Sequence, residues 1–207
     1  MNTRDAKKSN EKRQSRSIRT EQQLLDTAQD LFARQGYQAT KITEIVEGAG
    51  VSIGSFYHHF KDKEALAGVL VSRFIEHAGR IIDSVDLSRD THGNVEGMLT
   101  YLARAICDTM TGSLGVYRAA QRINSLSTDK QSSPGILVAP LKAKVMAQLP
   151  DYDDEIAGPD KAEALRHALQ LVIMVMLQTR LGAGELFPKD TDKLIAVTVK
   201  AAMGLLR

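Results

Sequence analysis

Side chains that can donate hydrogen bonds or exchange protons gather in residues 52–63 of this chain. Hydroxyl and ammonium groups donate to phosphate oxygens and base edges, so the pattern is typical of nucleic-acid contact. Imidazole pairs can also bind metals, but adjacent helical residues point about 100° apart, and we find no partner at ligand spacing nearby. We therefore expect no metal site here. The side chains concerned are Ser52, Ser55, Tyr57, His58, His59 and Lys63.

Catalytic motifs in the sequence would indicate an enzyme. We expect no nucleophile elbow, no zinc-protease helix and no phosphate-binding glycine loop, and Gly182-Ala183-Gly184 lies between expected helices with no strand before it. The expectation is that the chain is not an enzyme and needs no cofactor.

The segment before these side chains has the pattern of two helices. Apolar residues recur on one helix face over residues 20–35, with Thr20 as a candidate N-cap and Gly36 as a C-terminal stop. A short helix at 41–48 follows, and Thr40 is its candidate N-cap.

A third helix is expected at 52–58, after a turn at Gly50. Ser52 can cap it, and Phe56 and Phe60 face inward while the polar residues between them face outward. Two short helices joined by a glycine-containing turn predict a helix-turn-helix, whose second helix enters the major groove of DNA.

The remainder of the chain has helical patterns and no persuasive strand. A helix capped by Asp62 is expected to end near Val85, and residues 86–94 have the composition of a loop. We expect an all-α protein with a basic, disordered arm at 1–19, a helix-turn-helix domain at 20–66 and a larger helical domain at 67–207. Its later helices are expected at 95–111, 116–126, 136–149, 160–182 and 190–206.

Composition limits the class of protein. Hydrophobic residues make up 43% and charged residues 25%, as in ordinary globular domains. The single Cys107 cannot form an intramolecular disulfide, and the polar N-terminus has no signal-peptide pattern. No run of 18 apolar residues suggests a membrane span, so we expect a cytoplasmic protein.

Positive charge is concentrated at the N-terminus. The net charge is +2, yet residues 1–63 carry 11 Lys and Arg against 8 Asp and Glu. Residues 1–19 alone carry a net charge of +5. This segment is either a solvated tail or an arm that adds phosphate or minor-groove contacts, and both interpretations stay open.

Residues 20–66 resemble the signature of TetR-family regulators through the segment GYQATKITEIVEGAGVSIGSFYHHFKDKEAL. The resemblance covers about the first third of the chain. It implies a homodimeric repressor that binds palindromic operator DNA through the helix-turn-helix and is released by a small-molecule inducer. Two positions depart from the pattern, since many members have Lys at Ile53 and Thr at Lys41. The expected DNA contacts are Thr40, Lys41, Ser52, Ile53, Gly54, Ser55, Tyr57, His58, His59 and Lys63.

The last two expected helices carry the candidate dimer interface. Residues 168–177 are apolar nearly all round, so this helix must be covered on more than one side. A four-helix bundle with a second copy would cover it, and a deeply buried helix in a monomer is the alternative. The expected interface residues are Leu165, Leu169, Val172, Val175, Met176, Leu194, Val197, Ala201 and Leu205.

In the resembled family the C-terminal domain holds a ligand cavity. Amphipathic residues at helical spacing more often form a core than a pocket, and Cys107 is either a redox sensor or a small buried residue. Three alternatives to a repressor stay open: an activator, a ligand-independent architectural DNA binder, and a small-molecule-binding protein without specific DNA recognition. The candidate ligand contacts are Tyr101, Arg104, Met110, Tyr117, Arg118, Gln121, His167, Met174 and Gln178.

Overall fold

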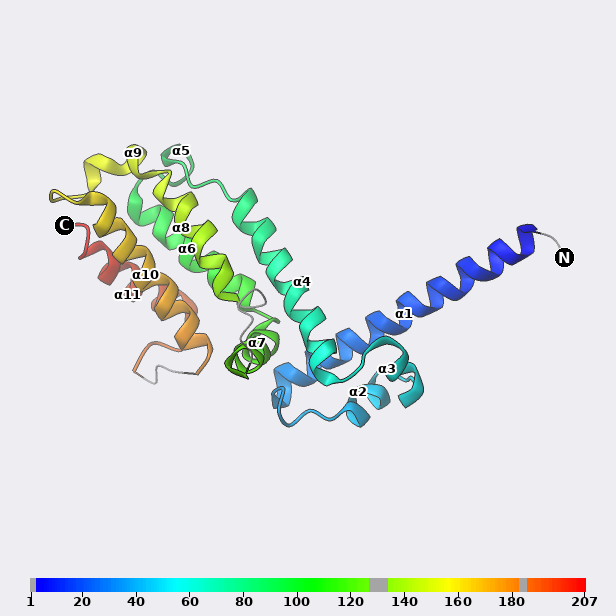
Figure 1. The fold of residues 1–207 in the computed structure, drawn as a ribbon. Helices are drawn as coiled ribbons and strands as arrows, with labels where there is room; N and C mark the ends of the chain where they lie inside the picture. Colours follow the sequence, from blue (N-terminus) through cyan, green and yellow to red (C-terminus); the bar gives the residue numbers. More distant parts are fainter. Residues whose placement is uncertain (1–2, 127–133, 183–185) are drawn as a thin grey trace. The chain divides into compact units, whose positions relative to one another are not determined.

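The computed structural model describes residues 3–126, 134–182 and 186–207, and these residues form helices, turns and loops with no strand. They divide into two compact units (Figure 1). The N-terminal unit holds the described residues of Met1–Phe74 and Gly115–Ser133, and the C-terminal unit holds those of Ile75–Leu114 and Pro134–Arg207. The expected all-α class is confirmed.

The N-terminal unit is built from α1 (Thr3–Gln35), α2 (Ile42–Gly48), α3 (Ile53–His59), the first half of α4 (Lys63–Ser84) and nearly all of α7 (Leu114–Leu126). Helices α1, α2 and α3 pack on one another. Burial of large apolar side chains, each worth about 1.5–3 kcal/mol, holds them together. The most buried are Leu24, Leu25, Phe32, Ile45, Phe56 and Leu66.

Helix α1 is longer than expected. The sequence predicted a start near Thr20 after a disordered arm, but the helix begins at Thr3. Residues 3–35 contain neither Gly nor Pro and are rich in Lys, Arg, Gln and Glu, which favour helix. Nothing therefore interrupts the backbone hydrogen bonds at Thr20. The helix stops as expected at Gly36, whose φ is +82°.

Helix α7 belongs to the N-terminal unit, whereas the sequence placed residues 116–126 in the second domain. Its second residue, Gly115, lies so close to α1 that a Cβ there would be 2.4 Å from the carbonyl carbon of Phe32 and 2.4 Å from the nitrogen of Ala33. The ring of Tyr117 also contacts Phe74 edge to face, with centroids 6.1 Å apart. A glycine thus permits two helix backbones to touch.

The C-terminal unit is organised around three helices that pack on one another: α6 (Val95–Met110), α10 (Lys161–Arg180) and α11 (Thr191–Met203). Helix α8 (Val138–Met146) also packs on α10. The core includes Cys107, whose Sγ lies 3.6 Å from Met176 Sδ. Cys107 is therefore a small buried residue.

Two connections differ from the expectation. The loop expected at 86–94 contains the short helix α5 (Arg89–His92). The single helix expected at 136–149 is divided into the 3-10 helix η1 (Pro134–Leu137), α8, and α9 (Leu149–Tyr152), which is followed by η2 (Asp153–Glu155). Pro150 has no backbone N–H and cannot continue the bonding pattern of α8, but a proline is tolerated in the first turn of α9.

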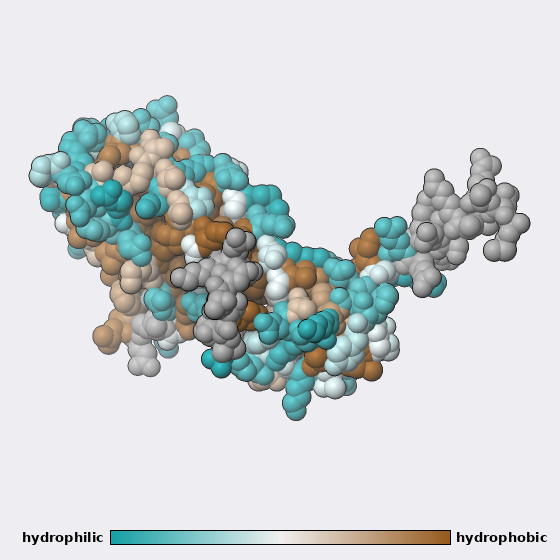
Figure 2. Space-filling view, in the orientation of Figure 1, coloured by the Kyte–Doolittle hydropathy of each residue, from teal (hydrophilic) through white to brown (hydrophobic). Residues whose placement is uncertain are grey.

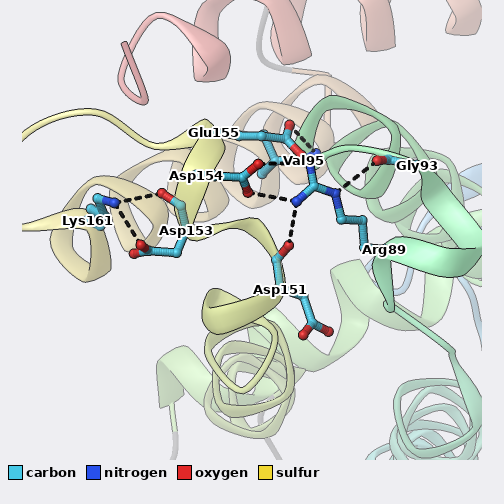
Figure 3. Close-up of polar contacts among 8 residues, drawn as sticks. All are labelled: Arg89, Gly93, Val95, Asp151, Asp153, Asp154, Glu155 and Lys161. Carbon is cyan, nitrogen blue, oxygen red and sulfur yellow. Dashed lines mark hydrogen bonds and ion pairs between the residues drawn. The ribbon is translucent and has the colours of Figure 1, made fainter.

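Arg89 ties these two connections together (Figure 3). Its guanidinium donates to the Asp154 carboxylate at 2.7 and 3.1 Å and to the Asp151 carbonyl at 3.1 Å. The Glu155 carboxylate lies 3.1 Å from the same guanidinium and accepts the amide of Val95, the first residue of α6, at 3.0 Å. The path from α4 to α6 is thereby fixed to the segment before α10.

Among residues 3–126, 134–182 and 186–207, no helix is long and apolar enough to cross a lipid bilayer.

Candidate nucleic-acid interface

The turn between α2 and α3 is shaped by two glycines and a serine. Gly50 has φ +65°, a backbone conformation that side chains disfavour, and a Cβ at Gly48 would lie 2.8 Å from Thr27 Cγ2 on α1. Ser52 is the N-cap of α3, and its Oγ accepts the Ser55 amide at 3.1 Å. The expected cap is confirmed, as is the Asp62 cap of α4, which accepts the Ala65 amide at 2.8 Å.

The outer face of α3 is a thin, mostly uncharged surface. Ile53 and Tyr57 are 47% and 57% exposed, and Gly54 and His58 are exposed beside them. A Cβ at Gly54 would meet nothing closer than Ser52 Oγ at 3.8 Å. The packing of the chain therefore does not require a glycine at this position.

Ser52 and Ser55 share a hydrogen bond across the start of α3, with their Oγ atoms 2.9 Å apart. The Ser52 hydroxyl is thus occupied by the cap and by Ser55. Ser55 is half-buried, but its hydroxyl can donate outward when it accepts from Ser52. On α2, the side chain of Lys41 is exposed at the N-cap.

Residues 50–54 also spell GxSxG, the pattern of the nucleophile elbow of α/β-hydrolases, so the expectation that this pattern is missing was wrong. An elbow needs a strand before the serine, and here α2 precedes it. The Ser52 hydroxyl caps a helix instead of facing a catalytic base.

Lys63 does not occupy the place that the sequence suggested. We expected a phosphate contact, but its ammonium donates to the carbonyls of Tyr37 at 2.7 Å, Gln38 at 3.4 Å and Thr40 at 2.6 Å. It also lies 4.5 Å from the centre of the Tyr37 ring. Burial lowers the pKa of Lys63, and the nearby Glu44 raises it to a lesser extent. The ammonium therefore clamps the turn between α1 and α2.

Thr40 and His59 also point away from the exposed face. Thr40 is 1% exposed and its hydroxyl donates to the Gly36 carbonyl at 2.8 Å, so it neither caps α2 nor reaches solvent. Lys41 is the N-cap of α2, and the Glu44 carboxylate accepts its amide at 2.7 Å. The side chain of His59 is 10% exposed and faces α1. These tertiary contacts remove both residues from the candidate interface.

One exposed basic residue, Lys61 between α3 and α4, was missing from the sequence prediction. Charge alone could have indicated it, because cations beside a recognition helix contact phosphates. Arg16 and Arg19 are exposed on α1 and belong to the basic segment 1–19, for which the sequence left phosphate contacts open.

The candidate ligand residues lie on different helices and in both units. Met110 is buried in the C-terminal unit, whereas Tyr117 is buried in the N-terminal unit with Arg118 and Gln121 exposed near it on α7. Arg104 is exposed and paired with Asp192. The remaining candidates are also exposed on their helices, namely Tyr101, His167, Met174 and Gln178.

The candidate interface residues fall into two groups. The larger group lies inside the core of the C-terminal unit, so the expectation that these side chains face a second copy was wrong; it comprises Leu165, Leu169, Val172, Met176 and Leu194. Val175 is half-buried. Val197 and Ala201 are exposed on α11, and Leu205 is exposed just after this helix. Met174, which we had assigned to ligand binding, is the exposed apolar residue on α10.

The fold and the exposed face of α3 define a helix-turn-helix protein with a second helical unit. Residues 24–70 match the family model of the bacterial regulatory proteins, tetR family. A crystal structure of a regulatory protein in the tetR family from Rhodococcus RHA1 shares the fold, with a TM-score of 0.65 and 18% identity over 90% of this chain and 96% of that chain. The N-terminal domain therefore matches the tetR family model, and the chain shares its fold with a solved tetR-family protein.

Curated relatives match in the same region. The transcriptional repressor KstR2 of Rhodococcus jostii (strain RHA1) is 34% identical over 97 residues, which are 46% of this chain and 47% of that protein. The transcriptional regulator AcrR of Shigella flexneri is 49% identical over 47 residues, which are 23% of this chain and 22% of that protein. The chain thus matches less than half the length of these relatives.

Proposed function

We propose that this protein is a ligand-responsive transcriptional repressor that binds palindromic operator DNA as a homodimer. The observation that carries the proposal is the outer face of α3. It presents a hydroxyl, an imidazole and an apolar side chain around Gly54, a glycine that the packing of the chain does not require. A missing side chain lets the helix approach base edges in the major groove. A bacterial regulator of this kind works in the cytoplasm.

Each exposed residue has a distinct role in this proposal. Ile53 contacts a thymine methyl, and Ser55 donates to a base edge or a phosphate. Tyr57, Lys41 and Lys61 contact phosphates, which position the domain without reading sequence.

The test uses DNA fragments from around the gene of this protein in a gel-shift assay at low salt. A retarded fragment is expected for the wild type. Gly54→Ala should reduce affinity at least tenfold, because the added methyl group holds the helix away from the bases. Gly68→Ala is the matched control, since Gly68 lies on α4 with nothing within 4 Å of an added Cβ, and it should bind as the wild type does.

Two outcomes would contradict DNA recognition by this face. Full affinity of Gly54→Ala would show that α3 does not approach the bases. The absence of a retarded band for every fragment would favour a small-molecule-binding protein that lacks specific DNA recognition, an alternative that Ile53 supports because it offers no charge to a phosphate.

The homodimer rests on exposed apolar surface of the C-terminal unit. Met174 on α10 and Val197 on α11 are 53% and 48% exposed, and Figure 2 shows apolar residues at the surface on this side of the unit. Apolar patches of this kind mark interaction sites. A dimer through this surface would hold two recognition helices at the fixed separation that adjacent major grooves need, about 34–36 Å.

Charged substitutions test the interface. Met174→Glu and Val197→Glu should each yield monomers in analytical ultracentrifugation and greatly weaken operator binding. The control is Ile136→Glu, which places the same charge at another apolar residue, 47% exposed on η1, and should leave the dimer intact. A dimer that survives both substitutions with full operator affinity would eliminate this interface.

A further inference from the structure

The N-terminal part of α1 extends beyond the packed core of its unit (Figure 1). Glu21 marks the place where the extension begins, because its Oε2 lies 3.9 Å from Nδ1 of His59, the last residue of α3. From residue 14 onward, the first buried side chain of α1 is that of Leu24. Residues 3–19 form this α1 extension, which starts beside the end of α3 and leads away from the core.

The length of the α1 extension can be compared with that of DNA. An α-helix rises 1.5 Å per residue, so residues 3–19 span about 25 Å. Successive phosphates along one strand of B-DNA are spaced about 3.4 Å apart along the helix axis. The α1 extension is therefore as long as about seven base pairs.

Positive charge dominates this segment. Residues 1–19 carry seven Lys and Arg against two Asp and Glu, a net charge of +5. Arg16 and Arg19, at the end nearer to α3, are exposed. In a helix, residues four apart fall on the same face. A basic residue stands at every fourth position of the α1 extension, namely Arg4, Lys8, Lys12 and Arg16.

Apolar residues are nearly absent from the α1 extension. In its sequence only Ala6 and Ile18 are apolar, and Ile18 is 62% exposed. A helix that lies on a membrane or packs on another protein helix needs an apolar stripe. Binding to a nucleic-acid backbone needs only positive charge. The composition of the α1 extension therefore fits phosphates and not an apolar partner.

We propose that the α1 extension is a helical arm that contacts the phosphates of the DNA flanking each half-site, outside the bases that α3 faces. The inference rests on the proposed function and deepens it. A helix with its side chains is about 10–12 Å wide, whereas the minor groove is about 6 Å wide. The arm therefore contacts the DNA backbone and does not enter the minor groove. It adds affinity without reading sequence, because phosphate contacts carry no base information.

The test measures how affinity depends on the length of flanking DNA. Footprinting on the fragment found by gel shift defines the half-sites, and fluorescence anisotropy of the full chain gives the affinity for duplexes with successively longer flanks. Affinity should rise about tenfold in total and stop rising within about seven base pairs of flank. Changing the base sequence of the flanks should have no effect. Deleting residues 2–13 leaves about 9 Å of the arm, so the rise should then stop within about three base pairs.

Substitutions separate the charge of the arm from its length. Glutamine favours helix about as well as lysine and arginine do, so replacing the four basic residues at every fourth position by Gln keeps the helix and should abolish the gain from flanking DNA. Arg16→Gln alone should lower the slope of log affinity against log salt by about one. Arg34→Gln is the matched control at the other end of α1, where the Arg34 side chain is 74% exposed, and it should change neither quantity. Circular dichroism and thermal unfolding verify that each variant is folded.

Three outcomes would overturn the inference. The first is a wild type that binds duplexes with and without flanks equally, which would make the α1 extension a solvated helix. The second is a gain from flanking DNA that persists in the fourfold Gln variant, and the third is an equal change of slope in Arg34→Gln and Arg16→Gln. Each is distinct from the absence of DNA binding by the wild type, which would refute the proposed function itself.

Discussion

Replacing Lys63 by Met tests whether its ammonium stabilises the fold or contacts DNA. The substitution keeps an aliphatic stem against Tyr37 but removes the ammonium, which makes hydrogen bonds of 2.7 and 2.6 Å to the carbonyls of Tyr37 and Thr40 and a longer one to Gln38. Hydrogen bonds to charged groups contribute about 1.5–3 kcal/mol each. Desolvation of the half-buried ammonium, which lowers its pKa, offsets part of this. We expect the free energy of unfolding to fall by about 2 kcal/mol.

The assay is urea unfolding followed by circular dichroism, in which a shift of the midpoint at constant slope reports the change in stability. Lys61→Met is the matched control. Lys61 is exposed two residues earlier, so its loss should change stability by less than about 0.5 kcal/mol. It should instead reduce the salt dependence of operator binding by about one phosphate contact.

The reverse pattern would refute the reasoning. If Lys63→Met kept its stability and lowered the salt dependence of binding by about one contact, the ammonium would be bound to a phosphate, as the sequence had suggested.

Three further predictions concern other parts of the chain. Asp86 accepts hydrogen bonds from the Thr91 hydroxyl and the Ser88 amide, which lower its pKa from 3.8 to about 2. Because the pKa is lower in the folded state, this stabilisation is present above about pH 4 and is lost as the pH falls through about 2. Asp86→Asn should therefore flatten the acid-unfolding profile in that window, and an unaltered profile would contradict the prediction. Gly115→Ala should destabilise the folded protein by about 1–3 kcal/mol, because the added methyl group overpacks against α1. Gly68→Ala should stabilise the folded protein by up to about 1 kcal/mol. Equal effects of the two substitutions in thermal unfolding would show that α7 does not contact the α1 backbone. Leu169→Ala should lower the free energy of unfolding by about 2–5 kcal/mol, because Leu169 is 2% exposed within its own unit. The protein should keep its oligomeric state in ultracentrifugation. A monomer of unchanged stability would place Leu169 at an interface between subunits.

The order of helices α1 to α4 and the caps of α3 and α4 were predictable from sequence. Ser52 and Asp62 each accept an amide three residues ahead, and such a bond depends on nearby residues alone. Gly36 likewise ends α1 through its own backbone freedom. Periodicity and caps therefore located the helix-turn-helix without any knowledge of packing.

The extent of α1 was within reach of the sequence but was misjudged. A capping pattern at Thr20 competed with an uninterrupted run of helix-forming residues from Thr3. A cap is needed only where a helix must begin, and no Gly or Pro forces a beginning at Thr20.

Tertiary structure alone decided which side chains of a helix remain available to a partner. Lys63 is satisfied by carbonyls 23 to 26 residues earlier in the chain, and His59 faces Glu21 on another helix. In α10, a nearly uniform apolar sequence concealed which face meets α6 and α11, and the structure buries Leu169 and Val172 while it exposes Met174. Sequence determined helix caps and stops such as those at Ser52, Asp62 and Gly36, because those features are local. Packing between distant segments determined which side chains stay exposed, because a helix face that is buried in the core cannot contact a partner.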